Sequence, residues 1–230
     1  MRFKNEFEKY AVQHEGIGSL KLDYYNKQVQ ASLTPYILEE REMRVTQMDI
    51  FSRMMLERII FLYGTVNENM AAISQAQLMF LDNLETKDIT LQISSPGGSV
   101  LSGLGICDVM DYVSSDISTV NMGLAASMGS IILSSGTKGK RHSLKHSRVM
   151  LHTVSSGAEG KVQDLLISFK EAEKYNEILF DILAKNTKKT KEQVMKDADR
   201  DFWLSSQESV SYGLIDSIIT NKIVKSKGKN

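Results

Sequence analysis

The chain has 230 residues, of which 42% are hydrophobic and 24% are charged, as is usual for a globular protein with a sizeable core. Lys and Arg (28) balance Asp and Glu (28), so the formal net charge is zero, which argues against nucleic acid or an anionic membrane as the main partner. A single cysteine, Cys107, excludes an intramolecular disulfide, and we expect it to be a small buried residue in a helix.

The N-terminal residues 1–13 are charged and lack the apolar centre of a signal peptide. No apolar run reaches the roughly 18 residues that a membrane-spanning helix needs. We therefore expect a cytoplasmic protein. The glycine-containing stretch 136–140 lacks the spacing and the hydroxyl of a phosphate-binding loop, so any ATP that the protein's work requires would be hydrolysed by another chain.

Residues 1–44 are polar and only weakly periodic, and we expect them to form an appendage whose order depends on partners. From Thr46, the apolar residues Met48, Phe51 and Met55 recur at helical spacing and predict a helix. The last ten residues, 221–230, contain four lysines and no acidic residue, which is typical of a solvated tail.

From Arg58 onward, apolar runs that are typical of strands alternate with helical patterns. Strands are predicted at 58–63, 88–93, 117–122 and 147–154, and helices at 72–80, 100–113 and 162–185, followed by two short helices capped at Thr190 and Ser205. The long helix is expected to direct most of its apolar residues to one side: Leu165, Ile167, Ala172, Ile178, Leu179 and Leu183. This alternation predicts an α/β fold with a largely parallel sheet.

Ser127 stands among small residues, after an apolar strand and before the apolar run 131–133. Two interpretations are open. Serine is a common N-cap of a helix. Alternatively, Ser127 is a nucleophile placed where free backbone N–H groups at a helix start can bind an oxyanion.

An activated serine needs a base and a group that orients the base, and four histidines are available. His14 lies in the appendage, and His142 and His146 flank a Lys/Arg-rich hairpin, where we expect them to be solvated. His152 lies at the end of an apolar strand, and it is either a base facing a cleft or a core histidine with its hydrogen bonds satisfied.

Asp197, Asp199 and Asp201 form a charged cluster before Phe202-Trp203. The cluster is either a solvated helix end or, for Asp201, which directly precedes the aromatic pair, part of a half-buried site. The turn Pro96-Gly97-Gly98 follows a strand, and its glycines allow backbone N–H groups to approach a ligand closely, although turns of this composition are common.

Together these residues have an order that closely resembles the ClpP family, serine peptidase family S14. The motifs are Ser-Pro-Gly-Gly, Ala-Ala-Ser-Met-Gly, Ser-Arg-Val-Met-Leu-His, Asp-Arg-Asp-Phe-Trp-Leu-Ser and Tyr212-Gly213-Leu214-Ile215-Asp216. The resemblance runs from about Arg44 to Ile219. It implies a crotonase-like fold of repeated β-β-α units over residues 45–220, with a protruding strand–helix handle at about 153–186.

The resemblance also implies a site: Ser127 as nucleophile, His152 as general base and Asp201 as the group that orients His152. The backbone N–H groups of Gly98 and Met128 would form the oxyanion hole. The activity implied is endopeptidase cleavage of unfolded polypeptides through an acyl-enzyme, without metal or cofactor. ATP would be used by an AAA+ unfoldase partner of the Clp type.

The assembly implied is two stacked heptameric rings that enclose a chamber. Asp199 and Arg200 match an acid–Arg pair that links subunits across the rings. Segment 1–44 would be either a propeptide removed by self-cleavage or the material of an axial loop.

The chain departs from the family pattern in two places. Thr153-Val154 replaces the Gln-Pro that usually follows the histidine. On the face where the family binds unfoldase loops, Thr90, Gln92 and His142 replace apolar residues, whereas four positions remain apolar: Tyr112, Val120, Met122 and Leu144. These departures leave two alternatives open, docking through a second ClpP-type subunit and a non-catalytic ring subunit. A crotonase-type acyl-CoA enzyme is a third.

Overall fold

A computed structural model describes residues 36–41, 44–155 and 161–220 of the chain, in two compact units, residues 1–57 and residues 58–230. In the first unit, strands β1 (Tyr36–Arg41) and β2 (Arg44–Asp49) form an antiparallel hairpin, followed by helix α3 (Ile50–Leu56). The predicted helix start at Thr46 is wrong, because residues 44–49 pair with β1 and the helix begins only after Asp49, whose carboxylate accepts the N–H of Ser52. The remainder of segment 1–44 and the tail 221–230 lie outside the described residues.

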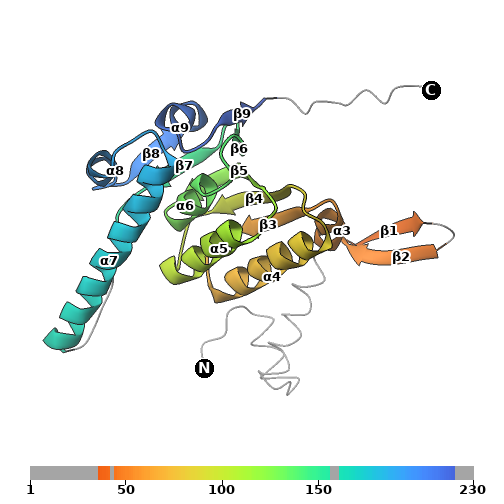
Figure 1. Cartoon of the computed structure of the whole chain (residues 1–230), viewed down its shortest axis with the longest axis horizontal. Coiled ribbons are helices and arrows are strands. Elements are labelled where there is room, and N and C mark those ends of the chain that lie inside the picture. The colour runs from red at the N-terminus through yellow and green to blue at the C-terminus, as the bar shows by residue number, and fades with distance from the viewer. Residues whose placement is uncertain (1–35, 42–43, 156–160, 221–230) are drawn as a thin grey trace, which may run out of the picture. The chain divides into compact units, whose positions relative to one another are not determined.

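The second unit is built on a seven-stranded, mostly parallel sheet, as the alternating pattern predicts (Figure 1). Its strands are β3 (Ile59–Tyr63), β4 (Ile89–Ser95), β5 (Ile117–Ala126), β6 (Arg141–Leu144), β7 (Arg148–Leu151), β8 (Phe202–Ser205) and β9 (Ser217–Ile219). The strand order is β3-β4-β5-β6-β9, and β7 pairs with the second half of β5 and, in antiparallel fashion, with β8. Strand β5 therefore changes partner half-way along its length.

Helices α4 and α5 follow β3 and β4 and lie together beside the sheet (Figure 1). The helices of this unit are α4 (Glu68–Leu84), α5 (Val100–Tyr112), α6 (Met128–Ser134), α7 (Val162–Asn186), α8 (Lys191–Asp197) and α9 (Ser206–Tyr212). The caps expected at Thr190 and Ser205 are present, and Ser205 forms a full capping box with Glu208. Cys107 is buried in α5, as expected, and burial raises the pKa of its thiol to about 12.

The long helix α7 extends away from the sheet, and only its C-terminal half packs on the unit (Figure 1). Its buried residues are Leu179, Phe180 and Leu183. Two of the other apolar residues of the helix, Ile167 and Ile178, are exposed in the single chain. Residues 156–160 of the expected handle lie outside the described residues.

An ion pair between the buried Arg141 and the half-buried Asp216 joins β6 to the segment before β9. The guanidinium donates to both carboxylate oxygens at 3.0 and 2.7 Å, and it also donates to the carbonyl oxygens of Ser134 and Asn186. The side chain of Arg141 is only 4% exposed. The pair therefore connects the sheet to the C-terminal ends of α6 and α7.

Within the described ranges, none of the helices has both the length and the apolar character needed to cross a membrane. The same residues contain no cluster of three or more His, Cys, Asp or Glu side chains arranged to hold a metal ion.

Candidate active site

The candidate residues meet at one edge of the sheet because of its topology. Strands β4, β5 and β7 run parallel, so their carboxyl ends lie at the same edge. Directly after these ends come the turn 96–98, Ser127 and His152, respectively. Strand β8 runs antiparallel to β7, so its first residue lies at this edge too, immediately preceded by Asp201.

Ser127 occupies the N-cap position of α6 but does not act as a cap. Its side chain makes no capping hydrogen bond, and its backbone has φ 53° and ψ −123°, a conformation uncommon for a residue with a Cβ atom. Its N–H is held by the carbonyl oxygen of Met150 at 2.9 Å. The hydroxyl is therefore free to point toward β7, and of the two interpretations of Ser127, the cap is excluded.

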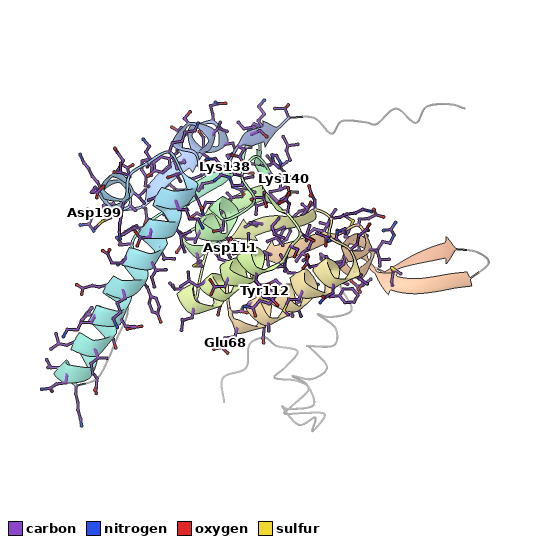
Figure 2. The ribbon with its side chains drawn as sticks, viewed as in Figure 1. Glu68, Asp111, Tyr112, Lys138, Lys140 and Asp199 are labelled. Atoms are coloured by element: carbon purple, nitrogen blue, oxygen red, sulfur yellow. The ribbon has the colours of Figure 1, made fainter. Side chains whose placement is uncertain are left out.

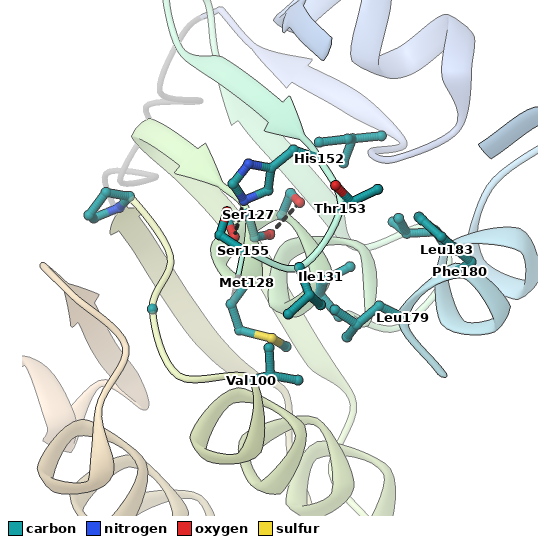
Figure 3. Close-up of a pocket in the computed structure, with 15 residues that line it drawn as sticks. Val100, Ser127, Met128, Ile131, His152, Thr153, Ser155, Leu179, Phe180 and Leu183 are labelled. Carbon is teal, nitrogen blue, oxygen red and sulfur yellow. Dashed lines mark hydrogen bonds between the residues drawn. The ribbon is translucent and has the colours of Figure 1, made fainter. Parts of the chain in front are cut away.

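His152 contacts both of the other candidate side chains, and Figure 3 shows its contact with Ser127. Its Nε2 lies 2.8 Å from Ser127 Oγ, and its Nδ1 lies 3.3 Å from Asp201 Oδ1. The β7–β8 register explains the second contact: the ladder ends with Leu151 opposite Phe202, so the next residues along the two strands, His152 and Asp201, face each other. The three side chains form one continuous chain of polar contacts.

The aspartate cluster divides into three different environments. Asp201 reaches the site, although 63% of its side chain is exposed. Asp197 accepts a hydrogen bond from the Tyr212 hydroxyl at 3.0 Å, and burial, together with this carboxylate, raises the pKa of Tyr212. Asp199 and Arg200 are exposed to 78% and 94%, with 3.9 Å between Asp199 Oδ2 and Arg200 Nε, and Figure 2 shows Asp199 at the surface near α8.

The turn at Gly97-Gly98 packs directly against the start of α6. Both glycines have positive φ, 94° and 149°, and a Cβ atom at Gly97 would lie 2.6 Å from Ser127 Cβ and 3.0 Å from Met128 N. On the other side, a Cβ atom at Gly98 would lie 2.2 Å from the carbonyl oxygen of Val66. Because both positions are glycine, with no Cβ atom, the turn can lie directly next to Ser127.

Two backbone N–H groups beside Ser127 are available to a ligand. Val66 holds the turn through its bonds to Gly97 and Ser99, at 2.9 Å each. Within the described part of the chain, no acceptor is bound by the N–H of Gly98 or by that of Met128, the first residue of α6. Such N–H groups are suited to an oxyanion, and the nearby helix start favours negative charge.

A mostly apolar cavity of about 270 Å³ opens beside Ser127 and His152 (Figure 3). Its apolar walls come from α5, α6, β7 and α7, with these residues among them: Val100, Ile131, Leu151, Leu179, Phe180 and Leu183. The sequence pattern placed Leu179 and Leu183 on one side of a long helix, but nothing in that pattern indicated that they border the serine.

The segment that follows His152 is held by two hydrogen bonds. The N–H of Thr153 donates to the carbonyl oxygen of Ala198 at 3.1 Å, and the N–H of Val154 donates to Asn176 Oδ1 at 2.7 Å. Sequence reasoning missed Asn176, and the chain carries no motif that would have identified it. A proline at position 154 would have no N–H for this contact.

Among the described residues, the other two histidines, His142 and His146, lie away from this edge. His142 is half-buried in β6 with Nδ1 at 2.9 Å from Ser217 Oγ, so it is less solvated than expected. Burial lowers its pKa, although the charge of Asp216 opposes this shift. His146 is exposed, as expected, and His14 lies outside the described residues. His152 is therefore the histidine that the described fold brings to the serine.

Comparison with known proteins gives concordant matches. The family model described as "Clp protease" matches residues 40–222. The ATP-dependent Clp protease proteolytic subunits of Bacteroides fragilis (strain YCH46) and Bacteroides thetaiotaomicron are each 45% identical over 219 residues, which is 95% of this chain and 100% of each relative. The subunit of the same name from Porphyromonas gingivalis is 45% identical over 216 residues, covering 94% of this chain and 97% of the relative.

Proposed function

The chain belongs to the Clp protease family and is a serine-type endopeptidase, and we propose that Ser127, His152 and Asp201 perform its chemistry. One observation carries the assignment of these residues: His152 Nε2 lies 2.8 Å from Ser127 Oγ while its Nδ1 lies 3.3 Å from Asp201 Oδ1. Family membership also removes the acyl-CoA enzyme as an alternative.

The distances support an acyl-enzyme mechanism. Ser127 Oγ attacks the peptide carbonyl carbon while its proton moves to His152 Nε2. When the C–N bond breaks, the imidazolium gives this proton to the leaving amine, and a water molecule then releases the acyl group by the same route. Asp201 keeps the ring in the tautomer with Nδ1–H and stabilises the imidazolium.

The negative charge that develops on the carbonyl oxygen needs fixed donors. We assign this role to the N–H groups of Gly98 and Met128, because the turn packs against Ser127 and both groups are free within the described residues. Removal of one such donor typically costs about 10²–10³-fold in kcat. The chemistry needs only side chains, backbone and water, so we propose that ATP is used by the partner unfoldase rather than by this chain.

The apolar cavity predicts the side chain preferred on the acyl side of the scissile bond. Its walls, among them Ile131, Leu179 and Leu183, favour leucine or norleucine, whereas a buried aspartate or lysine would lose its hydration without a partner. In a matched peptide series, we expect kcat/KM for leucine to exceed that for aspartate by about 100-fold or more. Equal values for the two peptides would contradict this assignment of the cavity.

The assignment of the nucleophile is tested by mass spectrometry after reaction with a fluorophosphonate. We expect one adduct, on the peptide that contains Ser127, because Oγ displaces fluoride at phosphorus while His152 takes the proton. The matched control is heat-denatured protein, in which the contact with His152 is lost and no adduct should form. An adduct on another serine would overturn the assignment.

The alternative is a non-catalytic ring subunit that assembles beside active paralogues. The contacts of Ser127 and His152 argue against it, because a subunit without activity has no need for them. An assay of the purified chain without any paralogue distinguishes the two roles. If this homogeneous protein hydrolyses the leucine peptide, the non-catalytic role is excluded.

For assembly, we propose two stacked heptameric rings in which α7 and the Asp199-Arg200 pair contact other subunits. The apolar side chains exposed on the N-terminal half of α7 support this proposal, since water is a poor environment for them: Val162, Leu166, Ile167 and Phe169. Asp199 and Arg200 are exposed in the single chain and are available to a partner. Unfolded polypeptides would be cleaved in the enclosed chamber.

Because relatives carry the name "ATP-dependent", we propose an AAA+ unfoldase of the Clp type as partner, docking on the sheet face that contains Gln92, Val120 and His142. The register places these three residues in one row across β4, β5 and β6. Tyr112, 77% exposed at the end of α5, adds an apolar element (Figure 2). Gln92 and His142 make this face more polar than a docking face lined by aromatic residues. A loop of the unfoldase would therefore have to form hydrogen bonds with these two side chains. Alternatively, a second ClpP-type subunit would bind the unfoldase.

A further inference from the structure

The segment His152–Ser155 connects the proposed base to the wall of the cavity. Pairing between β7 and β8 ends at Leu151 and Phe202, so the ladder does not extend to His152. Thr153, Val154 and Ser155 then line the cavity together with α7. The position of this segment therefore affects both the imidazole and the pocket.

We infer that Asn176 is a positioning residue for this segment: its side-chain oxygen, 2.7 Å from the N–H of Val154, anchors the backbone after His152 to α7. This inference rests on the proposed function. Asn176 is half-buried and lies three, four and seven residues before Leu179, Phe180 and Leu183, so it shares the face of α7 that forms the cavity wall. One helix thus sets both the wall and the main chain opposite it.

A side-chain acceptor is needed here because Val154 points its N–H at a helix. The carbonyl oxygens in the middle of α7 point along the helix axis and accept the helix's own hydrogen bonds, so an N–H that approaches the helix from the side meets a side-chain acceptor, here Asn176 Oδ1. Without Asn176, the bond of Thr153 to Ala198 would remain, but the next residue would lose its anchor. A displacement of about 1 Å at a catalytic group can cost roughly 10²-fold in rate.

The test compares three variants with the wild-type protein, using kcat, KM and the rate of fluorophosphonate reaction. Asn176→Leu removes the acceptor at similar size, and we expect kcat and the fluorophosphonate rate to fall together by about tenfold. Asn176→Asp keeps an acceptor oxygen and should restore both to within about threefold. Asn186→Leu is the matched control, because it removes a side-chain hydrogen bond of α7 to Ser135, away from the cavity.

Wild-type kcat in Asn176→Leu, or equal losses in the Leu and Asp variants, would overturn the inference. If Asn176→Leu does not fold, Val154→Pro removes the donor instead and should give a similar loss. In the double variant the two losses should not add, because both remove the same hydrogen bond, and additive losses would contradict the proposal. Ser127→Ala in the same assay distinguishes failure of this inference from failure of the proposed function. If Ser127→Ala still hydrolyses the peptide, the proposed function itself fails, whatever Asn176 does.

Discussion

Ser127→Ala is expected to lower kcat for peptide cleavage by roughly 10⁴ to 10⁶-fold. The variant removes the atom that attacks the carbonyl carbon, and His152 then has no hydroxyl within 2.8 Å to deprotonate. Substrate binding should be nearly unchanged, because the cavity walls and the backbone N–H groups remain. The measurement is steady-state cleavage of the leucine peptide, together with peptide affinity by fluorescence anisotropy.

Ser135→Ala is the matched control for this variant. Ser135 caps the C-terminal end of the same helix, α6, and its hydroxyl donates to the backbone carbonyl oxygen of Ile131 rather than to Ser127, His152 or Asp201. We expect kcat within about twofold of wild type. Cleavage by Ser127→Ala at more than about 1% of the wild-type rate would show that another group acts as nucleophile.

The alternation of strands and helices after Arg58 was readable from the sequence because long apolar runs determine those elements. The short strands β6 and β9 were not, because Arg141, His142 and Ser217 have no strong strand preference and are extended only through pairing with neighbouring strands. The helix predicted from Thr46 failed for the same reason: pairing with β1 overrides a helical spacing of apolar residues.

The site shows a similar division. Ser127, His152 and Asp201 were identified as candidates because each borders an apolar run, and a family resemblance joined them. Their contact distances depend on strand register, which no local pattern determines. Asn176 could not be found, because its partner lies 22 residues earlier in another element.

Asp216→Asn is expected to lower the free energy of unfolding by about 3 kcal/mol, the lower end of the usual cost of breaking a buried ion pair, because Asp216 itself is 21% exposed. The new amide group would turn a donor toward the guanidinium of Arg141, whose side chain is 4% exposed and would keep its charge without a counter-ion. The N–H groups of Gly139 and Arg141 would also lose a charged acceptor. Urea unfolding at fixed protein concentration, followed by circular dichroism, measures the difference.

Asp88→Asn is the control for this prediction, and pH provides an independent test. Asp88 is 58% exposed beside Lys140, so the same substitution there should cost under about 1 kcal/mol.

Burial alone would raise the pKa of Asp216, but the hydrogen bonds and charge of Arg141 outweigh it and hold the pKa below its usual value. A lowered pKa means that the carboxylate stabilises the fold above its unfolded pKa of about 3.9, and this contribution is lost as pH falls through the folded value. The difference in free energy of unfolding between wild type and Asp216→Asn should therefore be constant from pH 5 to 8 and become smaller below about pH 4. If this difference stays unchanged in acid, the charge of the carboxylate is not its cause.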